Sequence, residues 1–316
     1  MRLLVALGGN ALTGPDGSVL PRDQIASAKR AMSAVADLVA AGDDVVVTHG
    51  NGPQVGALLV RNELAASAVP PDPLDWCVAQ TQATLGFVLL DALEAALTAR
   101  GLVRRTAALV TRVLVDEADP AFRTPTKPIG RFLSASDADG LVAHGQRFAD
   151  FGARGWRRVV PSPRPREILD VPAIRTLVDA GFLVVANGGG GVPVVSRPDG
   201  TLQGIQAVVD KDLGAALLGI ALDVDKLLIA TDVENAVLGF GTSHAKPLEE
   251  LDVAEMRRYL EAGEFGSGSM GPKADAVCRF VEATGKVGVI TSLDAIVAGA
   301  AGRAGTVVVP TGAAVG

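Results

Sequence analysis

Short runs of consecutive apolar residues alternate along this chain with longer stretches in which apolar residues recur every three or four positions. The short runs are rich in Val and Leu, which is typical of strands buried on both faces of a parallel sheet. The longer stretches are typical of amphipathic helices that cover such a sheet. This alternation predicts an α/β fold with a mainly parallel sheet.

The pattern continues along almost the whole chain. Strands are expected at residues 2–7, 44–48, 106–115, 182–186, 226–230, 287–291 and 305–309. Helices are expected at residues 23–41, 53–66, 77–99, 211–222, 253–261, 272–284 and 293–300. From about 116 to 166 the alternation weakens and Pro and Gly accumulate, so we interpret this segment as an insertion with its own small substructure. A turn at Arg197-Pro198-Asp199-Gly200 predicts a boundary between two lobes, residues 1–200 and 201–316.

Two predicted strands run directly into loops of Gly and Asn that open a helix. The first loop is Gly8-Gly9-Asn10-Ala11 and the second is His49-Gly50-Asn51-Gly52-Pro53-Gln54, while residues 187–191 form a third Gly-rich strand end. Ligands of open α/β sheets gather beyond the carboxyl ends of the strands, and N–H groups at a helix start attract anions. Together the first two loops predict a site for one anionic ligand. Either loop alone is equally consistent with a tight turn.

Composition narrows the class of protein. The chain has 316 residues and a formal net charge of −6, which argues against a nucleic-acid partner because such a partner needs a basic face. Cys77 and Cys278 are too few and too isolated for a disulfide framework or a zinc site, so we expect a reducing, cytoplasmic compartment. We expect no membrane segment, since no apolar run approaches the roughly 18 residues of a span, and no signal peptide.

Three lysines stand in contexts that suit contacts with phosphate. Lys127 lies between two prolines that fix the local backbone, Lys211 begins a predicted helix, and Lys273 follows a proline at another helix start. A cation is unfavourable at a helix N-terminus, and a bound anion would offset that mismatch. Each lysine is also consistent with a solvated charge on the surface. Asp210 or Asp212 is also consistent with a helix N-cap that has no other role.

Several familiar motifs are absent or fail on context. Residues 266–271 match the dinucleotide pattern G-x-G-x-x-G, but a polar helix and turn precede them where that pattern requires a strand, so we reject it. The chain has no Walker A pattern, nucleophile elbow or Ser-His-Asp arrangement. Its histidines, His49, His144 and His244, share no metal-ligand spacing, so no metal site is predicted.

The remaining signals fit phosphoryl transfer. Thr231-Asp232 follows the predicted strand 226–230, at the end where nucleotides bind in open sheets. Its hydroxyl and carboxylate suit ribose, phosphate or Mg²⁺, although they also suit the cap of a turn. Phosphoryl transfer depends on position and positive charge more than on acid–base groups, because charge spreads over the moving phosphoryl oxygens. Three lysines and several Gly-rich loops match that requirement.

At these residues the chain resembles the carbamate kinases, a family with the amino-acid kinase fold, and the resemblance covers essentially the whole chain in order. The Gly-Asn loops and Thr231-Asp232-Val233 are shared with other amino-acid kinases. Residues 125–130 (Pro-Thr-Lys-Pro-Ile-Gly) and 159–163 (Val-Val-Pro-Ser-Pro) point to carbamate kinases in particular. The resemblance implies a three-layer αβα sandwich with a mainly parallel open sheet and a small protruding subdomain at about 116–166.

The resemblance also implies an activity and a cellular setting. The reaction would be ATP + carbamate = ADP + carbamoyl phosphate, run reversibly with Mg²⁺. The enzyme would be a cytoplasmic homodimer, often working towards ATP during amino-acid breakdown, such as arginine catabolism, or during ureide breakdown. Its N-terminal lobe would hold the phosphoryl acceptor, and its C-terminal lobe the nucleotide.

Residue roles follow from the same resemblance. The acceptor and the transferring phosphate would contact Gly8, Gly9, Asn10, Gly50, Asn51 and Gly52. The catalytic residues would be Lys127, which reaches over the pocket, Lys211 and Lys273, which neutralise phosphate charge, and Asp212, which orients a lysine. The nucleotide would contact Thr231, Asp232, Val233, Met270, Lys211 and Lys273.

The chain departs from the family pattern at three places. It has Thr81-Gln82-Ala83 where Ser-Gln-Gly is common, Glu234-Asn235-Ala236-Val237 where Asp-Gly-Val-Tyr is usual, and Gln206 in place of a glutamate. Two other functions therefore stay open. One is a kinase of another small carboxylate or phosphate acceptor on the same fold, and the other is a nucleotide-binding sensor without turnover.

Overall fold

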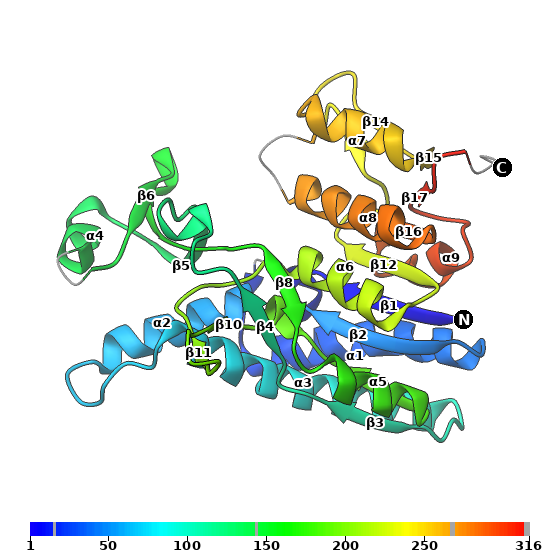
Figure 1. Ribbon diagram of the computed structural model, residues 1–316, viewed down its shortest axis with the longest axis horizontal. Coiled ribbons are helices and arrows are strands. Elements are labelled where there is room, and N and C mark those ends of the chain that lie inside the picture. The colour runs from blue at the N-terminus through cyan, green and yellow to red at the C-terminus, as the bar shows by residue number, and fades with distance from the viewer. Residues whose placement is uncertain (15–16, 143–144, 266–268, 313–316) are drawn as a thin grey trace.

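The computed structural model describes residues 1–14, 17–142, 145–265 and 269–312. An eight-stranded sheet forms its centre (Figure 1), in the order β15-β17-β16-β12-β1-β2-β9-β3. The strands are β1 (Arg2–Leu7), β2 (Asp44–His49), β3 (Arg105–Ala108), β9 (Phe182–Val185), β12 (Lys226–Thr231), β15 (Glu250–Asp252), β16 (Val287–Ser292) and β17 (Thr306–Val309). Neighbouring strands pair in parallel, except that β17 runs antiparallel to β16.

Helices cover both faces of this sheet, as the alternation of β1 side chains requires. Leu3 and Val5 pack with α1 (Pro21–Ala40), α3 (Leu74–Ala99) and α9 (Ile296–Ala300). Leu4 and Ala6 pack on the opposite face with a second group of helices. That group comprises α5 (Val171–Asp179), α6 (Lys211–Leu222), α7 (Val253–Glu261) and α8 (Met270–Thr284). The three-layer αβα sandwich with a mainly parallel sheet is confirmed.

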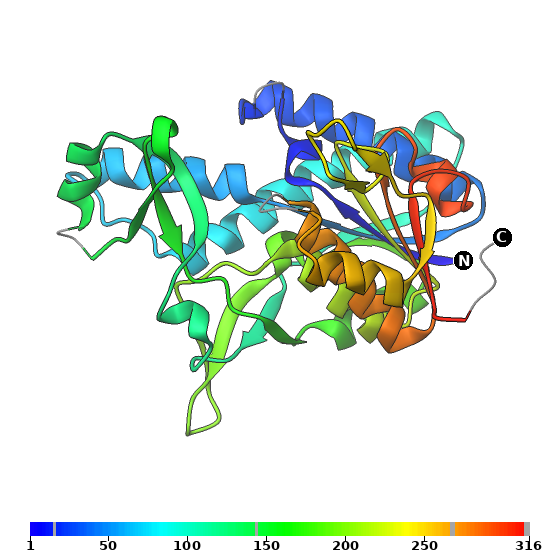
Figure 2. The same ribbon diagram turned by 90° about the horizontal axis from the view of Figure 1, so that it is seen from above.

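A smaller unit projects from one end of this sandwich (Figures 1 and 2). It contains a three-stranded antiparallel sheet in the order β5-β7-β6. Its elements are β5 (Lys127–Leu133), α4 (Ala135–Val142), β6 (Phe148–Asp150), η4 (Gly152–Arg154) and β7 (Trp156–Val160). The close approach of Gly56 in α2 (Gly52–Ala65) to Gly130 in β5 anchors the unit, since a side chain at Gly56 would lie 3.2 Å from the Gly130 backbone.

A second sheet of four strands lies between the projecting unit and the main sandwich. Its order is β11-β10-β4-β8, formed by β4 (Arg112–Val115), β8 (Pro165–Ile168), β10 (Val192–Ser196) and β11 (Leu202–Gly204). The remaining short elements are η1 (Gly9–Leu12), η3 (Pro120–Phe122), η5 (Gly188–Gly190) and the paired strands β13 (Val237–Leu238) and β14 (Lys246–Pro247).

The expected strand at 106–115 is wrong as one element. It divides into β3 of the main sheet and β4 of the second sheet. The break lies at Thr111, whose backbone N–H donates to Gln82 Oε1 at 2.8 Å and whose carbonyl accepts from Gln82 Nε2 at 3.2 Å. An apolar run does not reveal that a distant side chain satisfies its backbone. The helix expected at 293–300 is also shorter, since α9 begins at Ile296.

The division into two lobes at residue 200 stays a prediction. One sheet runs through both halves of the chain, because β12 pairs with β1 from Leu3–Lys226 to Leu7–Ala230. The loop at residues 266–268, where the rejected dinucleotide pattern begins, lies outside the described residues, and so does His144.

Among the described residues one helix, α3, is by length and composition apolar enough to cross a membrane, contrary to the expectation of no such run. The same helix packs in the protein core, where Leu85, Leu89 and Leu93 are at most 1% exposed. A core helix passes the same test, so this feature is weak evidence for a membrane span.

Candidate active site

The two Gly/Asn loops lie side by side at the carboxyl end of the sheet. The Gly50 N–H donates to the Leu7 carbonyl at 3.1 Å, and the Gly8 N–H donates to the Ala230 carbonyl at 3.0 Å. A Cβ at Gly50 would lie 3.2 Å from the Gly9 backbone and 2.9 Å from Cδ of Lys211. Glycine is therefore required at Gly50 for the loops to touch and for the Lys211 side chain to cross them.

A cavity of about 590 Å³ opens where these loops meet the projecting unit and the start of α6. Most residues predicted for phosphoryl transfer line it: Gly9, Gly50, Asn51, Gly52, Lys127, Lys211, Asp212 and Lys273. Other predicted residues lie outside its lining: Gly8, Thr231, Asp232, Val233 and Met270. Asn10 lies in η1, and its side chain falls outside the described part of the structure. Residues far apart in sequence thus meet at one cavity.

Asn51 is held from two sides. Its Nδ2 donates to the Thr81 hydroxyl at 2.9 Å, and Thr81 in turn donates to the Val78 carbonyl at 2.8 Å. On the other side Gly189, with a φ of +64°, approaches so closely that a Cβ there would lie 2.3 Å from the Asn51 amide. The departure from the family at Thr81 therefore keeps a hydroxyl behind Asn51.

Asp210 caps α6 and anchors the projecting unit. Its Oδ1 accepts from the N–H groups of Asp212 and Leu213 at 3.0 and 3.4 Å, which satisfies the free donors of the helix start. Its Oδ2 accepts from Lys127 Nζ at 2.8 Å. Burial opposes the charge of Asp210, but Lys127, then Lys211 and the backbone N–H, outweigh burial and hold the pKa of Asp210 below its usual value.

Asp212 joins the other two lysines. Its Oδ1 lies 2.6 Å from Lys211 Nζ, and its Oδ2 lies 3.3 Å from Lys273 Nζ. Burial, followed by the nearby charge of Lys211, lowers the pKa of Lys273, while Asp212 opposes that shift. Three ammonium groups and two carboxylates in these pairs leave one net positive charge at the cavity. Such a surplus attracts an anion, and positive charge is what a transferred phosphoryl group requires around its oxygens.

His49, at the start of the second Gly/Asn loop, is buried against the third Gly-rich loop. The ring is 2% exposed, and a Cβ at Gly188 would lie 2.5 Å from it. Burial lowers the pKa of His49 to about 4, although the Gly50 carbonyl, 3.1 Å from Nδ1, raises it. The ring is thus neutral near pH 7 and packs against Gly188 of the third Gly-rich loop.

The four residues predicted to contact only the nucleotide do not line this cavity, and two of them stand at the ends of elements. Thr231 ends β12, and Met270 begins α8. Gly8 connects this region to the first loop, since a Cβ there would lie 3.8 Å from Thr231 Cα. The segment at 234–237, which departs from the family pattern, is held by a buried hydrogen bond. The N–H of the buried Ala236 donates to Thr306 Oγ1 at 2.9 Å.

Sequence reasoning missed some of the cavity wall. Asp210 was readable as a cap, and Asp210 is in fact the cap, but the ion pair with Lys127 spans 83 positions and leaves no local signal. Gly189 stands in the third Gly-rich strand end, which the pattern did identify. Asn187 next to it takes the left-handed conformation, with a φ of +56°, although it is fully buried. That strained backbone turns the third loop toward Asn51.

An open αβα sheet with lysines around Gly-rich strand ends defines an enzyme built for phosphoryl transfer. The model of the amino acid kinase family matches residues 1–292, so the chain belongs to that family. A carbamate kinase from Trichomonas vaginalis is 43% identical, over 98% of this chain and 100% of its own length. A carbamate kinase from Pyrococcus furiosus is 40% identical, over 98% of this chain and 99% of its own. Within the family the chain therefore groups with the carbamate kinases.

Solved structures agree with this placement. Carbamate kinase from Giardia lamblia bound to AMP-PNP superposes with a TM-score of 0.92 at 38% identity, covering 98% of both chains. The same enzyme bound to citric acid gives a TM-score of 0.91 at 38% identity, also over 98% of both chains. The amino-acid kinase fold thus extends over nearly the whole chain.

Proposed function

We propose that this protein is a carbamate kinase, which transfers a phosphoryl group reversibly between ATP and carbamate to give ADP and carbamoyl phosphate. The observation that carries this proposal is the convergence of Lys127, Lys211 and Lys273 on one cavity beside the Gly9 and Gly50 loops. The relatives named carbamate kinase support it, since they match nearly the full chain.

The acceptor and the transferring phosphate would occupy the loop side of the cavity. There the backbone N–H groups of Gly9 and Gly52 and the side-chain amide of Asn51 would donate to oxyanions, while Gly50, whose N–H already donates to the Leu7 carbonyl, lines the cavity without a side chain. Lys127 is 42% exposed and paired with Asp210, so its ammonium is free to exchange this carboxylate for a phosphate oxygen. Lys211 and Lys273 would contact the phosphates of the nucleotide from the side of α6 and α8. Asp212 lies between these two lysines and reduces the repulsion between their charges.

Thr231, Asp232, Val233 and Met270 would contact the nucleoside next to this phosphate site. Mg²⁺ would enter with the nucleotide as part of the substrate, because this ion is carried mainly by phosphate oxygens and waters. Among the described residues no group of three or more His, Cys, Asp or Glu side chains is placed to hold a metal ion. We further propose a cytoplasmic homodimer that acts in amino-acid breakdown such as arginine catabolism.

Incubation of the purified protein with Mg·ADP and carbamoyl phosphate tests the proposal. ATP should form, and Lys127→Ala should reduce kcat by about 100-fold or more, because a charge that stabilises the transition state is lost. Arg131→Ala is the matched control, since Arg131 lies on the same strand, is 55% exposed and does not line the cavity. It should retain activity. If no ATP forms above the spontaneous background, the proposal is wrong. A panel of other carboxylate and phosphate acceptors would then be tested with ATP.

A further inference from the structure

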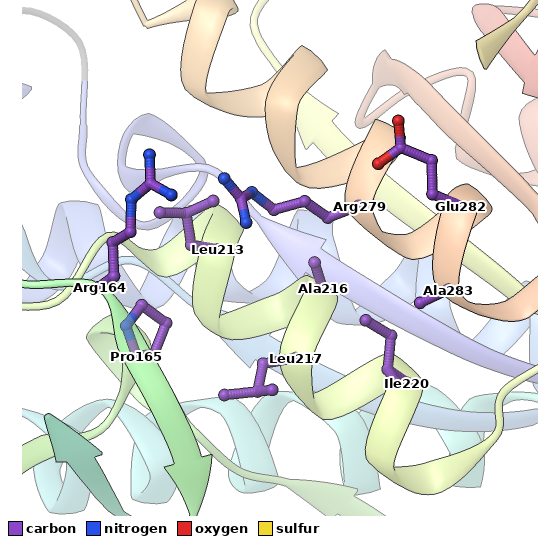
Figure 3. Close-up of a pocket in the computed structure, with 9 residues that line it drawn as sticks. All are labelled: Arg164, Pro165, Leu213, Ala216, Leu217, Ile220, Arg279, Glu282 and Ala283. Carbon is purple, nitrogen blue, oxygen red and sulfur yellow. The ribbon is translucent and has the colours of Figure 1, made fainter. Parts of the chain in front are cut away.

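A second cavity, of about 430 Å³, lies on the outer side of α6 and α8, next to β8 (Figure 3). None of the residues assigned above to phosphoryl transfer lines it. Its volume is in the range of small-molecule sites. The cavity therefore has the size of a binding site separate from the lysine-lined one.

The floor of this cavity is the outward face of α6. Leu213, Leu217 and Ile220 lie there and are only partly buried, whereas Leu218 and Leu222 on the other face are fully buried in the core. After its first two residues α6 has no charged side chain. A helix at a protein surface ordinarily turns a polar face outward. The apolar outer face of α6 is thus ready to bury an apolar group.

Two arginines stand at one end of this floor. In Figure 3 the Arg279 side chain extends over Leu213 toward Arg164, while the Glu282 carboxylate points away from α6. Arg164 is fixed at its backbone, where its N–H donates to Asp119 Oδ2 at 3.1 Å and Pro165 follows it. Within the described ranges its guanidinium forms no ion pair. It is therefore available to an anion from outside.

Arg257 and Arg279, the other arginines near this end, are already paired with carboxylates. Asp275 accepts from Arg279 Nε at 2.9 Å and from Arg257 at 2.5 Å, and Glu282 accepts from two nitrogens of Arg257 at 2.7 Å each. Arg257 and Arg279 thus share the charges of Asp275 and Glu282, whereas the Arg164 guanidinium has no ion pair among the described residues and the nearby Asp119 carboxylate accepts from its backbone N–H. Arg279 keeps its terminal nitrogens free to donate because Asp275 engages only its Nε.

We propose that this cavity is a second ligand site, which binds a small amphipathic carboxylate. Its carboxylate accepts hydrogen bonds from Arg164 and the terminal nitrogens of Arg279, and its apolar body lies on Leu213, Leu217 and Ile220. Guanidinium groups bind carboxylates with matched donor geometry, and the apolar floor supplies the rest of the affinity.

Octanoate is a suitable probe, with octanol as the uncharged partner of the same chain length. Binding is measured by calorimetry on the full chain saturated with Mg·ADP, so that the nucleotide site is filled. With about ten non-hydrogen atoms, octanoate should bind with a Kd of about 1 mM or tighter. Octanol should bind about tenfold more weakly, because it lacks the charge that the arginines recognise.

Two variants test whether octanoate binds in this cavity. The double change Arg164→Met and Arg279→Met should weaken octanoate binding about tenfold and leave octanol binding unchanged. Leu217→Asp should abolish binding of both probes, since it puts a carboxylate on the apolar floor. Arg166→Met is the matched control, because Arg166 lies on the same strand as Pro165, is 60% exposed and lines no part of this cavity. Each variant is first checked for a wild-type circular dichroism spectrum and melting temperature.

Several outcomes would overturn the proposal. One is octanoate binding that disappears in the presence of Mg·ADP, which would put the ligand in the nucleotide site. Another is equal binding of octanol and octanoate, or equal binding by the double variant. A Leu217→Asp protein that changes its oligomeric state, measured by light scattering, would instead make this face an interface between copies of the chain.

Discussion

Lys273 of α8 and Asp212 of α6 form an ion pair across 61 positions of sequence, with 3.3 Å between Nζ and Oδ2 and with both side chains at most 6% exposed. The same carboxylate lies 2.6 Å from Lys211 Nζ. One buried carboxylate thus pairs with two lysines whose positive charges would otherwise repel each other.

The change Asp212→Asn should destabilise the protein strongly. It leaves a buried lysine without its counter-charge, and removal of one partner of a buried pair typically costs about 3–5 kcal/mol. The free energy of unfolding, measured in urea, should fall by about 3 kcal/mol. Mg·ADP should restore part of this loss, because its phosphates supply negative charge to the same lysines.

Asp179→Asn provides the control for this change. Asp179 pairs with Arg2 and is 55% exposed, so its loss should alter the free energy of unfolding by less than about 0.5 kcal/mol. Equal effects of the two substitutions would contradict the role of Asp212 as a buried counter-charge.

Stability should depend on His49 at acid pH. Burial holds the pKa of His49 at about 4 in the folded state, whereas an unfolded histidine titrates near pH 6.5. Between these values the unfolded chain binds a proton that the folded chain does not, so the contribution is complete above about pH 6.5 and is lost as the pH falls toward 4, by about 3 kcal/mol.

The His49→Gln variant should lose less stability over that pH range than the parent protein, as measured by urea unfolding. His244 is exposed on the surface, so His244→Gln should follow the parent curve. An NMR titration of the His49 ring gives a direct check, and a midpoint near 6.5 in the folded protein would disprove the assignment.

Gly189→Ala should impair the acceptor side of the site. A Cβ at Gly189 would lie 2.3 Å from the Asn51 amide, and its φ of +64° is unfavourable for alanine. We expect kcat/KM for carbamoyl phosphate to fall about tenfold or more, since Asn51 must move. Gly200→Ala has a similarly positive φ of +82° but open space around it, so it should leave kcat/KM unchanged. An equal loss in both variants would indicate backbone strain alone.

Thr81 should act as a positioning residue through Asn51. Thr81→Val keeps the shape but removes the hydroxyl that accepts from Asn51 Nδ2 at 2.9 Å, and it leaves that amide without this partner. We expect KM for carbamoyl phosphate to rise about fivefold to tenfold, while KM for ADP stays constant. Thr81→Ser should restore the parent value, and a rise in both KM values would point to a general structural defect.

Much of the fold was predictable because an element that buries one face carries a regular spacing of apolar residues in its own sequence. The α7 bounds at 253–261 and the α6 bounds at 211–222 coincide with the prediction, since a polar cap precedes each apolar pattern. The strand at 106–115 could not be predicted, because the break at Thr111 depends on Gln82 of another element.

The sequence by itself determined which residues end strands, start helices and carry charge, so the Gly/Asn loops and the three lysines were recognisable without coordinates. Only the tertiary structure decided which charges meet. Lys127 pairs with Asp210 and Lys273 with Asp212 because the projecting unit and α8 fold back onto the start of α6. Local patterns fix the buried face of an element through its periodicity, whereas an ion pair between distant residues exists only after the packed core has set the distance between their backbones.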